Sequence, residues 1–541
     1  MSQNGSPATR ILILGGGFGG VYAAMGLERL LRGRRDVAVT LVNRENFFLF
    51  QPLLPEAAGG TIEAHHIVSP LRRMLRRTRI QVGEVEAIDP ERKTVTVSHG
   101  LVRHRHELAY DQLVLALGGA VHYFRIPGIA EQALPLKTLD DAFAIRSRVI
   151  RALELAEVEE DPAERRALLT FVVAGAGATG VETAAEINDL IRGSLARYRT
   201  LRREDIRLVV VDAAERILLE VPPKLAGRAT EELRARGIEV ITGSPVAGAD
   251  GEALWLKDGT RFPTRTIVWT AGVATNPVLR DLPCQKDERG RVVVNSELAV
   301  EGYPGVWAIG DNARVPLADG KPAPPTSQFA IREGKLVAAN IAATLGVGEC
   351  KPFTFTGLGS FVTMGRRKAL AEMFGVRFQG FPAWVAARSV HLAWLPRAEK
   401  KARVALDWAL DLAVGRDLAL LQTRLPREQL RARYRPGDTI VREGAAGDYL
   451  YVILDGEVAV SRDGDGAEPI ARLGRGEYFG EMAIFGEGPR TATVTAVTPT
   501  ETLLIPRQDV LAWAGSADEL RESFEATIRR RLGAGEEAAV G

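Results

Sequence analysis

Two glycine-rich turns, each between an apolar strand pattern and a helical pattern, constrain this chain more than any other feature. In the first, residues 10–14 (RILIL) run into the turn at 15–20 (GGGFGG), and a helical pattern follows over 21–32. In the second, a strand expected at 168–174 runs into the turn at 175–180 (GAGATG), and a helix is expected over 181–191. The repeat predicts two βαβ units with parallel sheets in one chain.

Turns of this kind are suited to holding a pyrophosphate. The first glycine allows the tight bend, the second lets the backbone approach the phosphates, and the third lets helix and strand pack closely. The helix start then offers unpaired amides and the positive end of its dipole. We therefore expect two Rossmann-like, dinucleotide-binding domains. The expected cofactor contacts in the turns are Gly15, Gly17, Phe18, Gly19, Gly20, Gly175, Gly177, Thr179 and Gly180.

The ends of the second strands indicate which nucleotide binds where. A carboxylate there hydrogen-bonds the ribose hydroxyls and repels a 2′-phosphate. Asp212 follows the strand expected at 206–211, which favours NADH over NADPH in the second unit, while Arg216 keeps the phosphorylated form open. Asn43 follows the strand expected at 37–42 in the first unit, and it offers a ribose one donor and one acceptor without charge.

Length, charge and cysteine content limit the class of protein. The 541 residues exceed what one core supports and suggest three or four domains. A formal net charge of +2 gives no general field for nucleic acid, so no nucleic-acid partner is expected. Cys284 and Cys350 cannot make a disulfide framework or a four-ligand zinc site, so no metal is expected either. Two thiols and a polar start without an export signal suit the cytoplasm.

The later part of the chain changes character twice. Residues 361–416 hold ten Lys and Arg against four Asp and Glu, interleaved with Trp384, Trp394 and Trp408. Such a segment suits an anionic membrane surface, and a pair of helices packed on the protein with a solvated basic face is the alternative. No apolar run is long enough to predict a bilayer-spanning helix. After residue 418, short strands with turn signals predict an antiparallel barrel, closed by an Arg- and Glu-rich helix.

Residues 10 to about 415 resemble the type II NADH dehydrogenases, which are single-chain NADH:quinone oxidoreductases. The stretches that match in order and spacing are LILGGGFGGVYAA, LVNRENFFLFQPLLPEAAGG, YDQLVLALGG, VVAGAGATGVETAAEI, TIVWTAGVATNP, GVWAIGDNA and PPTSQFAIREGKLVAANI. The resemblance implies FAD on the first unit, NADH on the second and a membrane quinone as electron acceptor. The flavin would carry the redox chemistry, and the protein would supply alignment and electrostatics.

The resemblance also implies roles for three residues. Asp311 matches the aspartate that holds the ribityl chain of the flavin, Glu182 the glutamate beside the nicotinamide, and Gln328 the glutamine on the quinone side. An ordinary turn aspartate, a solvated first-turn glutamate and a helix-surface glutamine are the alternatives. The quinone-side motif is only partly kept, because Ser327 and Arg332 stand where the family has an alanine and a glutamine.

Further contacts and the domain limits follow from the same resemblance. Cofactor contacts are expected at Asn43, Arg44, Gln51, Val85, Gly118 and Gly272. The implied domains are an FAD-binding domain at 8–130 and 265–345, an NADH-binding domain at 131–264, a membrane-facing segment at 346–417 and a C-terminal domain at 418–535. Sister enzymes that oxidise sulfide or reduce disulfides use a cysteine pair near the flavin, and the sequence contains no such pair.

Residues 418 to about 530 resemble the cyclic-nucleotide-binding domains of kinase regulatory subunits, gated channels and the catabolite activator protein. The stretches FGEMA at 479–483 and PRTATV at 489–494 carry the resemblance. It implies that amides near Glu481 face the cyclic phosphate, that Arg490 pairs with its charge and that Glu481 accepts a ribose hydroxyl. Thr491 can contact either base, so cAMP is favoured and cGMP stays open. The expected contacts are Gly480, Glu481, Met482, Ala483, Arg490 and Thr491.

The sequence as a whole predicts an FAD-dependent NADH:quinone oxidoreductase of the non-pumping respiratory type, peripheral on the cytoplasmic side of the cell membrane. A cyclic nucleotide at the C-terminal domain would tune activity or membrane contact, with either sign. A flavin-based redox sensor, and an NADH oxidase that uses oxygen or a soluble acceptor, are the alternatives. The sequence allows a homodimer and leaves the oligomeric state and the particular quinone open.

Overall fold

The computed structural model describes residues 9–99, 104–414, 416–419, 431–445, 447, 449–462, 469–485, 490–507 and 510–511. The chain divides into two compact units, one built from residues 1–97 and 106–422 and the other from residues 98–105 and 423–541. The Arg- and Glu-rich helix expected to close the chain lies outside the described residues.

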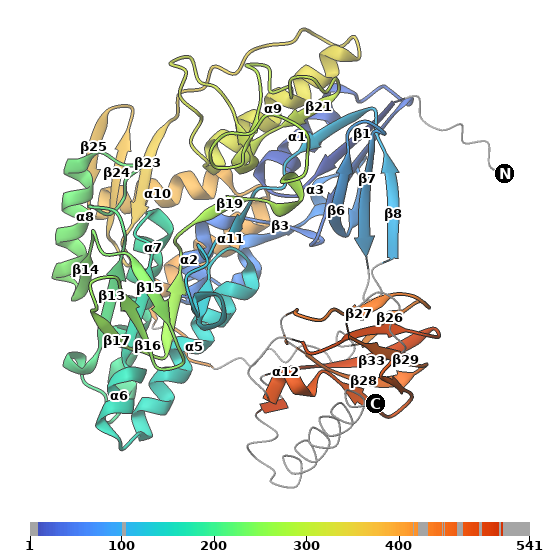
Figure 1. The fold of residues 1–541 in the computed structure, drawn as a ribbon. Helices are drawn as coiled ribbons and strands as arrows, with labels where there is room; N and C mark the ends of the chain where they lie inside the picture. Colours follow the sequence, from blue (N-terminus) through green and yellow to red (C-terminus); the bar gives the residue numbers. More distant parts are fainter. Residues whose placement is uncertain are drawn as a thin grey trace. The chain divides into compact units, whose positions relative to one another are not determined.

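The first unit contains two parallel sheets (Figure 1). A glycine turn follows a central strand of each sheet. The first sheet has the strand order β21-β9-β1-β2-β5, with every neighbouring pair parallel. Its strands are β1 (Thr9–Leu14), β2 (Val37–Asn43), β5 (Arg79–Val82), β9 (Gln112–Leu115) and β21 (Val306–Ala308). The last four residues of β1 are all buried, as in a parallel sheet covered on both faces.

The second sheet repeats this arrangement. Its strand order is β11-β18-β12-β13-β14, again parallel throughout. Its strands are β11 (Ala133–Pro135), β12 (Thr170–Ala174), β13 (Arg207–Val211), β14 (Ile238–Ile241) and β18 (Thr266–Trp269). Helix α7 (Ala178–Ser194) follows β12 through the second turn, α5 (Leu139–Val158) packs on β11 and β18, and α8 (Pro223–Ala235) packs on β14. The predicted pair of βαβ units is confirmed.

Strand β18 changes the domain limits expected from the sequence. It pairs with β11 and β12, so residues 266–269 complete the second sheet, although the sequence places them in the returning part of the FAD-binding domain. All four residues are buried, and a short apolar run does not reveal which of two parallel sheets it joins. A smaller difference is that β12 begins at Thr170, because α6 (Pro162–Leu168) occupies the residues before it.

Helices α1 (Phe18–Leu30) and α9 (Ser327–Thr344) pack against each other through small residues. A Cβ on Gly334 would lie 2.4 Å from the carbonyl oxygen of Gly19, and one on Gly26 would lie 2.6 Å from Cβ of Ala338. The two helix backbones therefore approach more closely than larger side chains would allow. This contact brings α9, which carries the stretch matched to the quinone side, against the helix of the first glycine turn.

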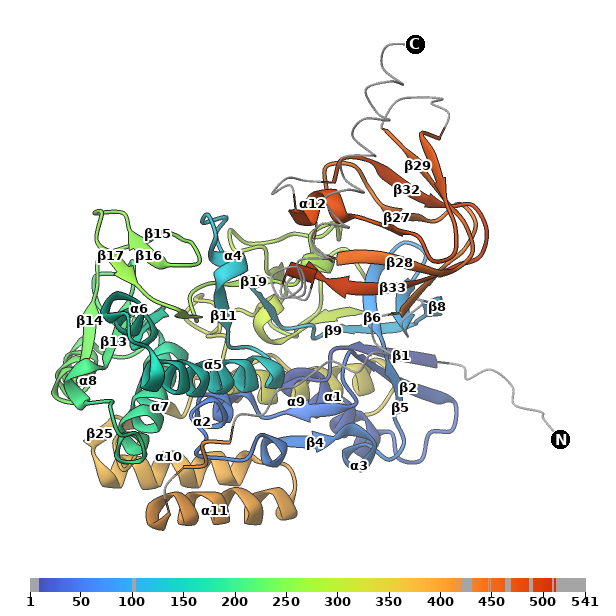
Figure 2. The ribbon, with the colours of Figure 1, turned by 90° about the horizontal axis from the view of Figure 1, so that it is seen from below.

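The segment expected to face a membrane folds as a small sheet followed by two helices. Strands β23 (Gly359–Thr363), β24 (Ala369–Met373) and β25 (Val376–Gln379) form an antiparallel sheet. Helices α10 (Phe381–Trp394) and α11 (Ala398–Ala413) follow and lie side by side (Figure 2). The two helices agree with the alternative that this segment forms a pair of helices packed on the protein. The sequence did not predict the small sheet that precedes them.

Two of the three tryptophans in this segment point into the protein. Trp384 and Trp408 are 6% and 7% exposed, and the Arg388 guanidinium lies over both rings, 4.1 and 4.4 Å from their centroids. Arg388 also pairs with the buried Glu56 at 3.1 Å, and the Trp408 indole donates to the same carboxylate at 2.6 Å. These two tryptophans therefore anchor the helices to the protein, and the expectation that they face a membrane is wrong.

The second unit contains the predicted antiparallel barrel. Its two sheets have the strand orders β26-β33-β28-β31 and β27-β32-β29-β30. The strands are β26 (Arg431–Tyr434), β27 (Thr439–Val441), β28 (Tyr449–Asp455), β29 (Val458–Ser461), β30 (Ala471–Leu473), β31 (Tyr478–Phe479), β32 (Thr493–Ala496) and β33 (Thr500–Pro506), and the short helix α12 (Glu481–Phe485) follows β31. Val441, Ile453, Phe479 and Val494 bring side chains of both sheets into one core.

Candidate active site

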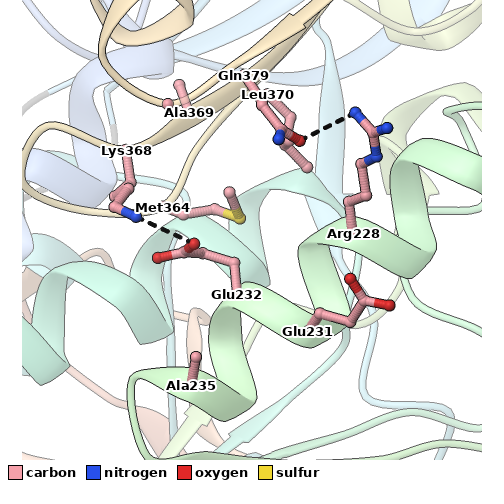
Figure 3. A pocket seen from close by; sticks show the side chains of 10 residues that line it. Arg228, Glu231, Glu232, Ala235, Met364, Lys368, Ala369, Leu370 and Gln379 are labelled. Atoms are coloured by element: carbon pink, nitrogen blue, oxygen red, sulfur yellow. Dashed lines mark hydrogen bonds and ion pairs between the residues drawn. The ribbon is translucent and has the colours of Figure 1, made fainter.

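A charged cavity of about 380 Å³ lies between α8 and the β23-β24-β25 sheet (Figure 3). Lys368 Nζ lies 3.2 Å from Glu232 Oε2, and Arg228 donates to Gln379 Oε1 at 3.1 Å. Cations and carboxylates offset each other in its wall, so the cavity favours neither an anion nor a cation. Its lining contains none of the residues expected to bind a cofactor. The candidate active site lies instead at the two glycine turns.

The two turns have the same backbone geometry. Gly15 and Gly175 each have a φ of +107°, which favours glycine. Gly20 and Gly180 each pack on the carbonyl oxygen of the first glycine of their own turn, so closely that a Cβ would lie 1.9 and 1.8 Å from it. Both turns thus have the tight bend and the close helix–strand approach of a pyrophosphate-binding loop.

The side chains at the ends of the second strands bind the turns themselves. Asn43 Oδ1 accepts a hydrogen bond from Gly16 N at 2.8 Å, and Asp212 Oδ2 accepts one from Ala176 N at 2.5 Å. Asp212 Oδ1 also accepts from Ala214 N at 2.8 Å. A carboxylate has about four acceptor positions, so Asp212 keeps acceptor capacity for ribose hydroxyls.

Arg216, the cation that could favour a 2′-phosphate, is bound to its own loop. Its guanidinium donates to the carbonyl oxygens of Ile217, Leu218 and Leu219 at 3.2, 2.6 and 3.1 Å. These bonds fold the side chain back on the backbone.

Asp311 follows the first sheet and meets groups that the sequence did not single out. Its carboxylate lies 3.7 Å from Lys137 Nζ, and burial raises its pKa against the effect of that lysine. Glu333 on α9 accepts a hydrogen bond from Gly310 N at 2.6 Å. It is 2% exposed, and burial raises its pKa to about 7. Lys137 lies far from Asp311 in the chain and outside the matched stretches, whereas Glu333 lies within the matched stretch at 324–341 without having been assigned a role there.

Glu182 lies near the start of α7, at the end of a row of carboxylates on one face of that helix. Because α7 begins at Ala178, Glu182 falls in its second turn and not in the first turn where a solvated glutamate would lie. Its Oε1 accepts hydrogen bonds from Thr363 N at 2.8 Å and from Thr363 Oγ1 at 3.0 Å. Burial, reinforced by the charges of Glu56 and Glu186, raises its pKa to about 8. The carboxyl is therefore mostly protonated at neutral pH.

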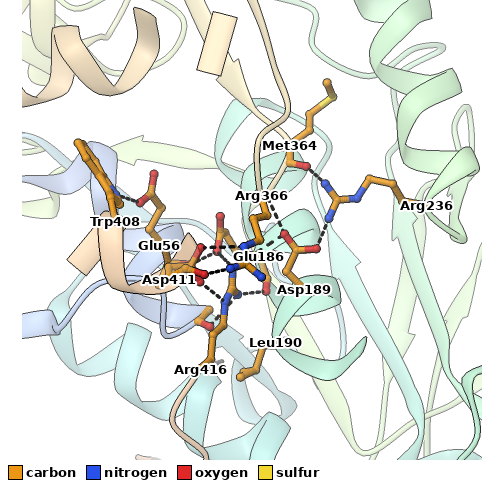
Figure 4. Close-up of polar contacts among 12 residues, drawn as sticks. Glu56, Glu186, Asp189, Leu190, Arg236, Met364, Arg366, Trp408, Asp411 and Arg416 are labelled. Carbon is orange, nitrogen blue, oxygen red and sulfur yellow. Dashed lines mark hydrogen bonds and ion pairs between the residues drawn. The ribbon is translucent and has the colours of Figure 1, made fainter. Parts of the chain in front are cut away.

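One turn further along α7, Glu186 and Asp189 enter a buried cluster with Arg416 (Figure 4). Arg416 Nη2 lies 2.8 Å from Glu186 Oε2, and its Nη1 donates to the carbonyl oxygens of Gly59 and Glu186 at 2.8 and 2.7 Å. Asp411 near the end of α11 lies 3.4 Å from Arg416 Nε. Burial raises the pKa of Glu186 to about 7 against the opposing charge of Arg416.

Asp189 connects this cluster to the small sheet. It accepts a hydrogen bond from Arg366 N at 2.7 Å, and the Arg236 guanidinium binds its other oxygen. Arg236 also donates to the carbonyl oxygen of Met364. The helix of the second glycine turn is therefore joined by ion pairs to segment 346–417, a connection that no sequence motif announces.

Gln328, expected to face a quinone, is bound to the chain just before and at the start of β23. Its Nε2 donates to the carbonyl oxygen of Gly359 at 3.1 Å, and its Oε1 accepts from Leu358 N at 3.0 Å. Arg332 donates to the carbonyl oxygen of Gln328 at 3.0 Å, and its guanidinium lies 3.8 Å from the centroid of the Phe355 ring. The nitrogen and the oxygen of the Gln328 side-chain amide are thus both hydrogen-bonded to backbone groups. Its contact with a quinone stays a prediction.

Three other expected FAD contacts differ in exposure: Phe18 and Val85 are buried, and Arg44 is exposed. Phe18 is 7% exposed and packs edge-on against Phe48, with ring centroids 5.0 Å apart, so its ring belongs to the core of the first unit. Val85 is also buried. Arg44 is exposed and pairs with Glu84 at 3.1 Å.

The remaining expected contacts, Gln51, Gly118 and Gly272, lie outside the strands of the two parallel sheets. Gln51 donates to a backbone carbonyl oxygen at 3.3 Å. Gly118, with a φ of +66°, donates from its amide to Asn312 Oδ1 at 3.0 Å, and a Cβ on it would meet no atom of the described chain within 4 Å. Gly272 has a φ of +76°, and a Cβ there would lie 2.4 Å from the Phe124 ring. Packing against Phe124 therefore explains why position 272 needs a glycine. Gly118, in contrast, borders free space.

The residues expected to bind a cyclic nucleotide lie around the start of α12 in the second unit. They are Gly480, Glu481, Met482, Ala483, Arg490 and Thr491. Arg490 is 5% exposed and donates to the carbonyl oxygens of Gly480 and Tyr449 at 2.8 and 2.7 Å. Thr491 Oγ1 donates to Met482 Sδ at 3.5 Å. Hydrogen bonds thus join the start of α12 to the residues just before β32. Pro489 lies outside the described residues.

Comparison with known proteins shows the family of the chain. Residues 9–334 match the family described as pyridine nucleotide-disulphide oxidoreductase, and residues 431–515 match the cyclic nucleotide-binding domain. The type II NADH:quinone oxidoreductase Ndh of Mycobacterium tuberculosis is 36% identical over 444 residues, which cover 78% of this chain and 93% of that protein. The chain belongs to the type II NADH:quinone oxidoreductase family.

A second relative agrees with this family, and a solved structure agrees with the fold. The type II NADH:quinone oxidoreductase NdhA of the same organism is 35% identical over 423 residues, 74% of this chain and 86% of that protein. The structure of NDH2 from Plasmodium falciparum in complex with NADH aligns with a TM-score of 0.71 at 19% identity, covering 76% of this chain and 100% of that chain. That likeness shows the fold. The predicted family and fold class are confirmed.

This type II family member exposes apolar side chains around the β24-β25 turn and on the two helices that follow. Each of them is more than 40% exposed: Phe374, Val376, Phe381, Val385, Leu406, Leu410 and Val414. Leu406 and Leu410 are four residues apart on α11 and so share one face of that helix. None of the helices among the described residues is both long and apolar enough to cross a bilayer.

Proposed function

We propose that this chain oxidises NADH and transfers the electrons to a membrane quinone with the help of bound FAD. The observation that carries the proposal is the pair of glycine turns with matching geometry, one after a central strand of each parallel sheet, in a chain of the type II family. Bound FAD would supply the redox chemistry by accepting a hydride from NADH and delivering two electrons to the quinone. The residues of this chain would bind and orient the reactants.

The first turn fits the pyrophosphate of FAD. A Cβ on Gly17 would meet no atom of the described chain within 4 Å, so the start of α1 borders free space. The first turn of α1 contains no acidic residue that would oppose the phosphates. Asn43, already bonded to the turn, would hold the ribose, and Asp311 beside Lys137 would hold the ribityl chain. The assignment of Asn43 comes from its place at the end of β2, and that of Asp311 comes from the family resemblance and agrees with its place just after β21.

The second turn would hold NADH. The negative charge of Asp212 disfavours a 2′-phosphate, and Arg216 is folded onto its own loop, so we infer that NADH is preferred over NADPH. Glu182 would lie beside the nicotinamide, with Thr363 fixing one of its oxygens. Because its pKa is raised to about 8, Glu182 can hold a proton at neutral pH. A reduced quinone takes up two protons, and a protonated carboxyl is a suitable donor for one of them.

The exposed apolar side chains of segment 346–417 support peripheral attachment to a membrane, which we assign to the cytoplasmic side. Basic side chains accompany the apolar ones at Arg366, Arg367, Lys368, Arg377, Lys400, Lys401 and Arg403. Apolar side chains can enter the interface while cations are attracted to anionic lipid headgroups. A lipid-soluble quinone requires an enzyme that reaches the bilayer, so membrane attachment and quinone reduction support each other.

We further infer that the second unit binds a cyclic nucleotide, with cAMP favoured, and that this binding changes turnover or membrane contact. The match to the cyclic nucleotide-binding domain and the hydrogen bonds that join the expected contact residues support this. Arg490 would exchange its bonds to the carbonyl oxygens of Gly480 and Tyr449 for bonds to the phosphate. An effect on the enzyme requires that the nucleotide binds two states of the chain with different affinity.

The test is NADH oxidation by full-length, FAD-loaded protein without detergent, in vesicles of anionic lipid that contain quinone. The proposal predicts yellow protein, faster turnover with NADH than with NADPH, and faster turnover with quinone vesicles than in air alone. Equal rates in air and with quinone would favour an NADH oxidase. Flavin reduction without turnover would favour a redox sensor, and protein that cannot be loaded with FAD would overturn the proposal.

A further inference from the structure

A carboxylate of the chain itself occupies the second glycine turn. Glu220 belongs to the loop between β13 and α8, and its Oε1 accepts a hydrogen bond from Ala178 N at 2.7 Å. Ala178 is the first residue of α7. Amides at the start of this helix are the groups that such a turn offers to a pyrophosphate. The carboxylate is therefore bound where the phosphates of a dinucleotide would bind.

The two glycine turns differ in this respect. A Cβ on Gly17 in the first turn would meet no atom of the described chain within 4 Å, whereas a Cβ on Gly177 in the second would lie 3.8 Å from Glu220 Oε1. Their first glycines have the same φ, and in each turn a backbone amide donates a hydrogen bond to the side chain at the end of the second strand. The two turns thus share their backbone geometry and their strand-end hydrogen bonds, and the second turn differs in also binding the Glu220 carboxylate.

The loop is held against the turn independently of the Glu220 side chain. Leu218 N donates to the carbonyl oxygen of Ala176 at 2.8 Å, and Val221 N donates to the carbonyl oxygen of Leu218 at 3.1 Å. Arg216 braces the same loop by binding the carbonyl oxygens of the three residues after it. The Glu220 side chain itself is exposed. It can therefore move into solvent while the loop stays in place.

We propose that Glu220 sets the affinity of the second turn for dinucleotides, as a carboxylate that caps α7 in the free enzyme and leaves when the pyrophosphate binds. The proposal rests on the proposed function, because it takes NADH to bind at this turn. Two anions cannot share one amide, since like charges at this distance repel each other. Binding then has to break a bond that is strengthened by the helix dipole, which weakens the affinity for NADH and NAD⁺ alike. The return of Glu220 to the amide also favours release of NAD⁺.

If Glu220 had a purely structural role, its removal would change the Kd for the dinucleotide in the opposite direction. If the carboxylate only fixed the loop for the incoming nucleotide, its removal would loosen the site and raise the Kd. If Glu220 competes with the pyrophosphate, its removal lowers the Kd. The competition also acts only on ligands that carry phosphate, so adenosine should not respond to the substitution.

The experiment compares Glu220→Gln and Glu220→Ala with Glu231→Gln as a control. Glu231 is an exposed carboxylate of α8, the helix that this loop enters, so the control removes the same charge elsewhere. With FAD-loaded, full-length protein, we expect the Kd for NAD⁺ and the KM for NADH to fall about three- to tenfold in both Glu220 variants, with kcat equal or lower. As inhibitors of NADH oxidation, ADP should gain affinity by a similar factor and adenosine should not. Glu231→Gln should match the parent protein.

The outcomes separate this inference from the proposed function. An unchanged or raised Kd for NAD⁺ in both Glu220 variants, or an equal gain for adenosine and ADP, would overturn the role of Glu220. Failure of the parent protein to bind either NAD⁺ or NADH would overturn the proposed function before any variant is compared.

Discussion

At the residue scale, buried ionisable groups are the main chemical feature of the first unit. Burial raises the pKa of Glu182 to about 8 and that of Glu333 to about 7, and both carboxyls lie close to a predicted cofactor site. Groups with strongly shifted pKa values are concentrated at functional sites. The sequence could point to Glu182, because it lies in a recognisable stretch after the second turn. It could not point to Lys137, because its partner Asp311 is far away in the chain, and it marked the stretch that contains Glu333 without showing that Glu333 binds Gly310.

Glu182 provides a prediction about pH. Its carboxyl is protonated below a pH of about 8 and loses the proton above it, so turnover with quinone should fall as the pH rises through that value. Glu182→Gln cannot release a proton at any pH, and its kcat should be about 10²-fold lower without the fall near pH 8. The measurement is kcat between pH 6 and pH 9.5. Glu252→Gln, on an exposed turn, serves as control, and a Glu182→Gln profile equal to that of the control would contradict the role.

Arg416 provides a prediction about stability. Arg416→Met removes the charge at similar volume and leaves Glu186 and Asp411 buried without this partner, so the free energy of unfolding should fall by about 3–5 kcal/mol. The pKa of Glu186 is already raised in the folded state, and it should rise further in the variant. Folding then opposes ionisation more strongly, so the deficit should grow as the pH rises above about 7.

Denaturant unfolding at pH 6 and pH 8 measures this deficit. The control is Arg207→Met, which breaks the exposed pair of Arg207 with Glu239 and should cost about 1 kcal/mol or less. Equal losses for the two variants, or a deficit that shrinks with rising pH, would show that Arg416 does not neutralise the buried cluster.

At the element scale, the strands and helices that carry the glycine turns follow directly from their sequence. A buried apolar strand, a turn that needs glycine and a helical pattern leave little choice of local structure. The sequence was less informative where an element depends on a distant partner. The run TIVW at 266–269 is apolar in either sheet, and only its pairing with β11 and β12 decides where it belongs. The β23-β24-β25 sheet could not be predicted for a similar reason, because a short amphipathic stretch can form either a strand or a helix.

The packing of α1 on α9 provides a prediction at this scale. In Gly334→Ala the new Cβ would lie 2.4 Å from the carbonyl oxygen of Gly19, so the helices must separate, and the free energy of unfolding should fall by about 1–3 kcal/mol. FAD should also be lost more readily, because the first turn begins α1. The matched control is Gly227→Ala in α8, where a Cβ meets nothing within 4 Å and should stabilise the helix by up to about 1 kcal/mol. Thermal unfolding and FAD retention on a desalting column measure both, and equal behaviour of the two variants would contradict the close packing.

At the scale of the whole molecule, the chain combines an enzyme of the type II family with a cyclic-nucleotide-binding domain. The segment after α11, near the end of the first unit, is bound by the rest of that unit at three successive residues. Arg416 lies in the buried cluster, Arg146 donates to the carbonyl oxygen of Asp417 at 2.9 Å, and Leu418 packs against the core. A conformational change transmitted along the chain would therefore act on a segment that is bound to the first unit close to Glu186.

Arg490 provides a prediction for the second unit. Arg490→Ala should weaken cAMP binding about 10- to 100-fold, because a charge-assisted bond to the phosphate is lost, and flavin reduction by NADH without cAMP should be unchanged. Arg490→Lys keeps the charge but not the fork of donors and should also bind cAMP more weakly. Arg472→Ala, at an exposed pair with Glu457, is the control, and isothermal titration calorimetry measures all three. Unchanged cAMP affinity in both Arg490 variants would show that the nucleotide binds elsewhere.

Anaerobic rapid mixing of FAD-loaded protein with NADH, followed by a second mixing with quinone, tests most directly whether the two turns hold cofactors that react with each other. The predicted result is loss of the oxidised flavin spectrum at least as fast as steady-state turnover, and its return on addition of quinone. A flavin that stays oxidised, although calorimetry shows NADH bound to the same preparation, would contradict the account.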